Sequence, residues 1–169
     1  MKKTLPILLS AVVFASPAFG QTDAALDARI AKGKIAFANC AACHGADGKG
    51  LPTNPPMAPA LVGSKLAAAA PEVSIAIVLK GIQKMDQKYL GVMAPLGVAM
   101  TDEQIADVLT YVRKSWGNAA APVTAEEVKT VREKYKDINV SLPRTAYEKK
   151  AEKLAEEAAG KAGAAPAAK

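Results

Sequence analysis

The chain is poor in the residues that build most metal centres, because its 169 residues include only one histidine and two cysteines. A structural zinc site takes four ligands, and Cys40, Cys43 and His44 supply three at most, so zinc would need carboxylates or a partner chain to complete its coordination. Because His44 is the only histidine, no metal bound by this chain can have two of the chain's imidazoles as ligands. The sequence also lacks segments with the alternating pattern of a β-strand, and it therefore predicts an all-α fold.

No cluster of one charge sign dominates the chain. Lys2 and Lys3 account for two of its six net positive charges. The other charges are divided evenly, since residues 21–123 and residues 124–169 each contain ten basic and eight acidic side chains. Nucleic acid is not expected as a partner, because it would call for a clustered basic face.

Only the N-terminus holds a long apolar run, from Leu5 to Ala15, and this run is too short to span a bilayer. Lysines precede it and small residues follow it, which is the layout of a secretory signal peptide over residues 1–20. The residue directly after position 20 is Gln21 and not a cysteine, so a lipid anchor is not expected. We predict an exported, periplasmic protein without a stable membrane span after signal cleavage.

Two amphipathic helices are expected in residues 21–118. The first covers about residues 26–39 and has Gly33 on its apolar face, where glycine costs helix stability unless another element packs closely. The second begins at Thr101, which forms a capping box with Gln104, and ends before Gly117. A shorter helix is expected after Pro71 in the loop-rich region between them.

The composition changes after Asn118, and residues 119–169 are expected to form a charged, Ala-rich and partly disordered helical tail. Helical segments are expected at about 124–137 and 147–159, with a break near Pro143. The second has a thin apolar face, which fits either a solvated spacer or an element that docks on a partner helix. The spacer is the simpler interpretation.

Cys40-Ala41-Ala42-Cys43-His44 places both thiols and the only imidazole within five positions. A dithiol oxidoreductase places its cysteine pair between a strand and a helix, but here the preceding segment is helical. Zinc leaves the coordination incomplete, and a plain disulfide gives His44 no role. Covalent haem c attachment uses all three residues: two thioether bonds from the cysteines and an iron ligand from His44. The motif therefore predicts one covalent haem c.

The order of several further motifs resembles that of the monohaem class I cytochromes c, in particular cytochromes associated with periplasmic dehydrogenases. The resemblance covers about ninety residues, 31–118, through GKIAFANCAACHGADGKG, PALVGS, YLGVMAP and MTDEQIADVLTYVRKSWGN. It implies the cytochrome c fold, in which the N- and C-terminal helices of the haem domain cross beside the haem. Gly33, Phe37 and Tyr111 resemble the residues at that crossing.

A methionine is the natural sixth ligand, because a thioether paired with histidine raises the reduction potential of haem. Four methionines follow the signal peptide: Met57, Met85, Met93 and Met100. Met93 resembles the axial methionine of the family, although Ala94 separates it from Pro95 where the family usually has Met-Pro. Pro59, in PALVGS, resembles the proline whose carbonyl holds the axial histidine, with Pro55 and Pro56 as rivals.

The resemblance implies an electron carrier and not an enzyme, because a haem with two protein ligands has no open position for substrate. Its expected partners are redox proteins: a dehydrogenase as donor, and a terminal oxidase or another cytochrome as acceptor. Lysines around the site could steer an acidic partner, or could serve solubility alone: Lys49, Lys80, Lys84 and Lys88. The alternatives are a haem enzyme or gas sensor with a labile sixth ligand, and a scaffold protein that uses the tail.

Overall fold

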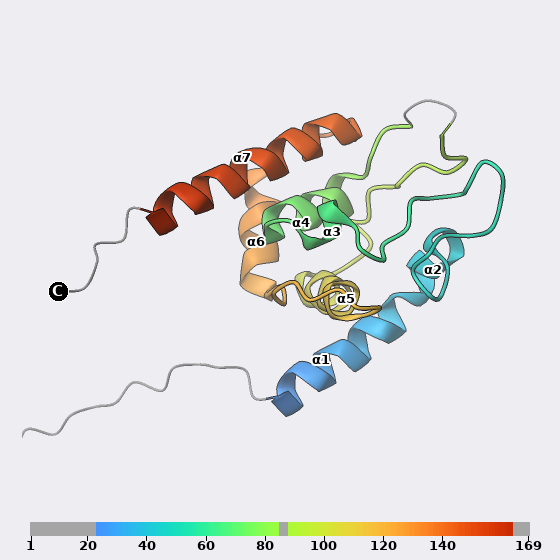
Figure 1. Ribbon diagram of the computed structural model, residues 1–169, viewed down its shortest axis with the longest axis horizontal. Coiled ribbons are helices and arrows are strands. Elements are labelled where there is room, and N and C mark those ends of the chain that lie inside the picture. Colours follow the sequence, from blue (N-terminus) through green and yellow to red (C-terminus); the bar gives the residue numbers. More distant parts are fainter. Residues whose placement is uncertain (1–22, 85–87, 164–169) are drawn as a thin grey trace, which may run out of the picture.

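The computed structural model describes residues 23–84 and 88–163, and within these ranges the chain forms seven helices and no named strand (Figure 1). The helices are α1 (Asp23–Ala36), α2 (Ala38–His44), α3 (Lys65–Ala68), α4 (Pro71–Lys80), α5 (Asp102–Lys114), α6 (Ala125–Lys134) and α7 (Arg144–Gly163). The predicted all-α fold is confirmed. The predicted signal peptide and Met85 lie outside the described residues. No helix in these ranges has the length and apolar character needed to cross a membrane.

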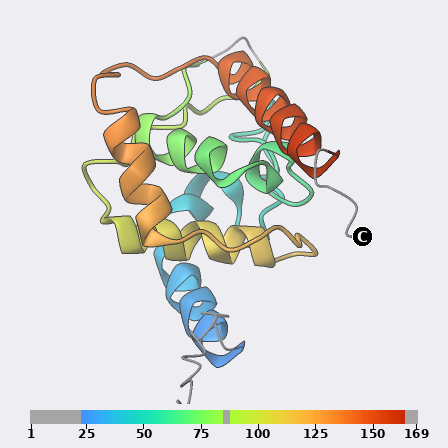
Figure 2. The same cartoon turned by 90° about the vertical axis from the view of Figure 1, so that its left-hand side faces the viewer.

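α1 packs across α5 (Figures 1 and 2). Gly33 of α1 lies directly against the backbone of α5 at this crossing. An ideal Cβ built on Gly33 would lie 2.0 Å from the carbonyl oxygen of Asp107 and 2.8 Å from Cβ of Tyr111. The rings of Phe37, Tyr111 and Trp116 then pack against one another, with centroids 5.3 Å apart in each pair. The helix crossing expected at Gly33, Phe37 and Tyr111 is therefore confirmed, and glycine at position 33 permits it.

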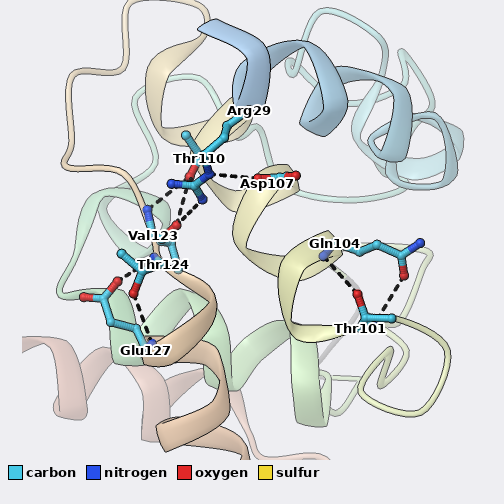
Figure 3. A network of polar contacts seen from close by, with 8 residues as sticks. All are labelled: Arg29, Thr101, Gln104, Asp107, Thr110, Val123, Thr124 and Glu127. Atoms are coloured by element: carbon cyan, nitrogen blue, oxygen red, sulfur yellow. Dashed lines mark hydrogen bonds and ion pairs between the residues drawn. The ribbon is translucent and has the colours of Figure 1, made fainter. Parts of the chain in front are cut away.

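A partly buried polar network joins this crossing to the chain that follows α5 (Figure 3). Arg29 donates from Nε to Oδ1 of Asp107 at 2.9 Å, and from Nη2 to Oγ1 of Thr110 at 3.1 Å and to the carbonyl of Val123. Thr110 is fully buried and exchanges two hydrogen bonds with the backbone of Val123. α1, α5 and the start of α6 are consequently tied at one point.

Capping boxes fix where α5 and α6 begin (Figure 3). The Thr101 hydroxyl accepts from the backbone N–H of Gln104, and the Gln104 side chain accepts from the backbone of Thr101 at 3.0 Å. Thr124 and Glu127 repeat the arrangement at α6. The predicted start of α5 is confirmed, because the capping box is a local signal that tertiary contacts do not need to supply.

α6 packs against α4 and α5 in the same hydrophobic core as α1 (Figure 2). Its Val128 and Val131 are buried, together with Val123 just before the helix. The division of the chain at residues 20 and 118 stays a prediction: the first boundary lies outside the described residues, and the second separates segments that share one core here.

α7 packs along α4 and α3, which differs from the solvated spacer favoured by its sequence. Tyr147 is 2% exposed, and its hydroxyl donates to the carbonyl of Gly81 at 2.8 Å. Near it, the Glu72 carboxylate accepts from Lys134 at 2.8 Å and lies 3.0 Å from Nζ of Lys150. The spacer interpretation was wrong for the first turns of α7, because the apolar face is thin but centred on one large aromatic side chain.

Candidate functional site

The two cysteines lie on α2, three residues apart and therefore on the same side of the helix. Both thiols are free and half-buried. Burial, together with the neighbouring Cys43, raises the pKa of the Cys40 thiol. A dithiol oxidoreductase needs the opposite, a thiol with a lowered pKa, and the element before α2 is a helix and not a strand. The surroundings of the pair do not favour dithiol chemistry.

His44 ends α2, and its ring is oriented by the backbone of the following loop. Nδ1 lies 3.0 Å from the carbonyl oxygen of Pro59, the contact expected from the family resemblance, and Pro55 and Pro56 do not supply it. A carbonyl oxygen can only accept, so Nδ1 carries the proton and the lone pair of Nε2 is left to bind a metal. Burial lowers the pKa of His44 against the opposing effect of this hydrogen bond, which favours the neutral, ligating imidazole.

The loop that carries Pro59 is fixed against the end of α5. Gly48 has a φ of +70°, and a Cβ there would lie 2.7 Å from the ring of Trp116. The carbonyl of Gly48 accepts from the N–H of Leu61 at 2.7 Å. Asn118 donates to the carbonyl of Leu61 at 3.1 Å and accepts from the N–H of Gly63 at 2.9 Å. The position of the Pro59 carbonyl therefore depends on the end of α5, and the role of Asn118 was missed by the sequence analysis.

A cavity of about 290 Å³ opens beside His44 and is lined by Cys40, Cys43, Met57 and Met93. Its other walls are mainly aliphatic, and they include Leu61, Leu66, Ile77, Val78, Ile82, Leu96, Val108, Leu109 and Val112. Met100 does not line the cavity. Two methionine side chains consequently reach the same apolar space as the cysteines and the histidine.

The two methionines belong to different segments. Met57 lies two residues before Pro59, in the loop that contacts His44, and a Cβ on Gly91 would be only 3.2 Å from its sulfur. Met93 belongs to the segment that leads into α5, and its carbonyl accepts from the N–H of Ile82 at 2.9 Å. Met93 is therefore carried by a different part of the chain from the loop that holds the histidine.

Arg144 is the one residue with a permanent charge among the described residues that line the cavity. It begins α7, and its Nε donates to Oε1 of Glu148 at 2.7 Å. In residues 23–84 and 88–163, the cavity included, no group of three or more histidine, cysteine or acidic side chains is arranged to hold a metal ion. The residues present therefore give no support to a zinc site.

A family model for cytochrome c matches residues 30–116, which contain every residue that lines the cavity except Arg144. The chain belongs to the cytochrome c family. Cytochrome c-552 of Thermus thermophilus is 36% identical over 114 residues, which make up 62% of this chain and 86% of that protein.

Two further relatives of this cytochrome c are named as dehydrogenase subunits. The fructose dehydrogenase cytochrome subunit of Gluconobacter japonicus is 37% identical over 99 residues, 55% of this chain and 20% of that protein. The gluconate 2-dehydrogenase cytochrome c subunit of Pantoea cypripedii is 36% identical over 102 residues, 56% of this chain and 22% of that protein. The match covers only about a fifth of each subunit.

The side chains around the cavity fit haem c, the cofactor that membership of this family implies. Two half-buried thiols stand at the wall, a neutral imidazole presents Nε2, and aliphatic side chains enclose the space. This donor set suits covalent attachment and iron ligation. α6 and α7 lie beyond the family match. Arg144, the first residue of α7, lines the cavity, and no sequence motif predicted this position.

Proposed function

We propose that this cytochrome c is an exported one-electron carrier with a single covalent haem c. Cys40 and Cys43 would hold the haem through thioether bonds, and His44 and Met93 would be the axial ligands. The observation that carries the proposal is the meeting of these four side chains at one apolar cavity. When bound, haem c supplies an iron that alternates between the ferric and ferrous states.

Met93 is the better of the two candidate sixth ligands. The Pro59 carbonyl engages Nδ1 of His44, so Nε2 points away from that carbonyl. The sulfur of Met57 is also packed beside Gly91. Because a ligand opposite His44 has to come from another segment, Met93, which leads into α5, fits that position.

Besides holding the haem, the protein would exclude water from the cavity and present one edge of it to partner proteins. Leu90 and Val92 are 45% and 56% exposed, and Val92 also lines the cavity. Lys84 and Lys88 are exposed on the same segment. An apolar rim with nearby cations suits brief contact with an acidic redox partner, because charge steers the encounter and apolar atoms make close approach.

The proposed donor is a periplasmic dehydrogenase, and the proposed acceptor is a terminal oxidase or another cytochrome. Two named relatives, the cytochrome subunits of fructose dehydrogenase and gluconate 2-dehydrogenase, support the donor class. The signal peptide expected at residues 1–20 would direct export, and this compartment suits haem c, which is attached outside the cytoplasm. Lys49 lies on the loop after His44, and its Nζ is 3.8 Å from Oδ2 of Asp47. The aspartate partly offsets the positive charge that Lys49 could offer to an acidic partner.

The experiment is expression with a haem c maturation system, followed by mass measurement and redox titration. The expected result is one haem per chain that survives denaturation, and a reversible titration with the slope of a single electron. The C40A/C43A double variant should lose the covalent bond, while K114A, a lysine change outside the cavity, should keep it. Absence of covalent haem in the native sequence, or turnover of a substrate at the iron, would contradict the proposal.

A further inference from the structure

The chain beyond the family match contacts the segment that carries Met93. We call residues 91–100 the Met93 loop; it runs from Gly91 to the residue before the cap of α5. Residues 119–163 reach this loop or its immediate support at two separate places, through α6 and through the start of α7. Each contact joins a residue outside the segment matched by the cytochrome c family to a residue within it.

Arg132 of α6 holds the end of the Met93 loop that is nearer to α5. Its Nη1 donates to the carbonyl of Gly97, and its Nη2 donates to the carbonyl of Met100 at 3.1 Å. Its Nε donates to Oδ1 of Asp102 at 2.7 Å. The three nitrogens of one planar guanidinium thus bind Gly97, Met100 and Asp102, where the loop turns into α5. A lysine cannot reproduce this geometry.

The start of the same loop rests on a chain of backbone pairs. Ile82 donates to the carbonyl of Met93 at 2.9 Å, and the adjacent Gln83 donates to the carbonyl of Leu142 at 3.0 Å. The Tyr147 hydroxyl then donates to the carbonyl of Gly81 at 2.8 Å, at a point where a Cβ on Gly81 would lie 2.3 Å from the carbonyl oxygen of Met93. Leu142, just before α7, and Tyr147, at its start, therefore support residues 81–83, which in turn support Met93.

Within the family-matched segment, the middle of the Met93 loop has one backbone tie to α4, from the N–H of Leu96 to the carbonyl of Val78 at 2.8 Å. Gly97 also lies close to α4, because a Cβ there would be 2.9 Å from the carbonyl of Leu79. The loop is otherwise irregular, and several of its side chains are exposed. Such a segment opens locally at low cost unless further contacts hold it.

We propose that the C-terminal segment is a clamp for the Met93 loop, with Arg132 as its positioning residue. The inference rests on the proposed function, in which Met93 binds the iron. If Met93 binds the iron, movement of its loop would help the sulfur to leave, and contacts that oppose this movement would make the sixth ligand less labile. Arg132 does not reach the haem cavity itself, so its effect is transmitted through the backbone at Gly97 and Met100.

The first test is the rate at which imidazole replaces the sixth ligand in the ferric, haem-loaded full chain, followed by stopped-flow absorption. R132Q removes the fork and should bind imidazole at least about tenfold faster, which corresponds to about 1.4 kcal/mol. R132K should fall between R132Q and the native protein. The control is K134Q, which removes a cation two residues away on α6 and breaks its ion pair with Glu72, 2.8 Å apart.

K134Q should stay within about twofold of the native rate, since its ion pair reaches α4 and not the Met93 loop. Equal rates for R132Q and the native protein, or equal acceleration by R132Q and K134Q, would overturn the clamp. Hydrogen exchange supplies a second readout that does not depend on haem ligation. R132Q should lose protection in residues 94–101 and keep it in the core of α5.

If R132Q lost hydrogen-exchange protection throughout the protein, Arg132 would contribute to global stability and not position the Met93 loop, and the proposal would be overturned. The two proposals fail differently. A native spectrum without methionine ligation would contradict Met93 as ligand, while the exchange pattern would still decide whether the C-terminal segment holds the loop.

Discussion

Gly33→Ala should separate the two helices that support the haem site. The new Cβ would meet the carbonyl oxygen of Asp107 at 2.0 Å, whereas ordinary contact begins at about 3.4 Å. The helices would have to move apart by about 1.4 Å at this point, the difference between these two distances. The new Cβ is bonded directly to the backbone of α1 and meets a backbone atom of α5, so no side chain can rotate away to relieve the clash.

The expected cost follows from three opposing contributions. Overpacking costs about 3 kcal/mol, at the upper end of its range because the clash involves backbone. Weaker packing of Phe37 on Tyr111 adds about 1 kcal/mol. The better helix propensity of alanine returns about 1 kcal/mol. We therefore expect a loss of about 3 kcal/mol in the free energy of unfolding.

Guanidinium unfolding of the haem-loaded protein measures this loss, with Gly160→Ala as the matched control. Gly160 also lies inside a helix, α7, but a Cβ there meets nothing within 4 Å. The same substitution should therefore leave stability unchanged or raise it by a few tenths of a kcal/mol. If G33A were as stable as G160A, the close crossing of α1 and α5 would be refuted.

Three other predictions concern the ligand, a buried cation and alkaline stability. Met93→Ala should keep the covalent haem, bind carbon monoxide in the ferrous state and have a lower reduction potential, whereas Met57→Ala should keep the native spectrum. Arg113→Ala should cost about 3 kcal/mol in denaturant unfolding, because Arg113 is 2% exposed and donates to three backbone carbonyls; Lys114→Ala should cost under about 1 kcal/mol. Burial raises the pKa of the Tyr147 phenol from 10.0 to about 12. The contribution of the neutral phenol to stability should therefore be complete below pH 10 and be lost as the pH rises through 12. Tyr147→Phe should reduce this alkaline loss of stability in unfolding curves recorded across the same pH range.

Each of these predictions has a result that would count against it. Carbon monoxide binding by M57A and not by M93A would exchange the roles of the two methionines. Equal stabilities of R113A and K114A would mean that the carbonyls around Arg113 find other donors. An identical alkaline loss in the native protein and Y147F would show that the folded state does not hold the phenol neutral.

Local signals explain what the sequence could predict. The capping box of Thr101 and Gln104 depends on residues three apart, and the attachment motif needs only the spacing of Cys40, Cys43 and His44. Such patterns carry their geometry within one turn of helix. Pro59 was reached through the family resemblance, because a contact over fifteen residues cannot be read from spacing.

Contacts between distant segments explain what the sequence could not predict. Arg113 lies in the last turn of α5, where a basic residue usually complements the end of a helix, but it is buried and donates to Ala67, Ala69 and Ala121. Tyr147 looked like part of a thin apolar face, and its partner carbonyl is 66 residues away. A one-sequence pattern gives the apolar face of a helix but does not say which other element covers it.

The central claim is that His44 and Met93 close both axial positions of one haem. It is tested most directly by the absorption spectrum of the haem-loaded native protein: ferric, ferrous, and ferrous with carbon monoxide. The account predicts a low-spin ferric spectrum with the methionine-to-iron charge-transfer band, and a ferrous spectrum that carbon monoxide leaves unchanged at neutral pH. A high-spin ferric spectrum or ready carbon monoxide binding would contradict it.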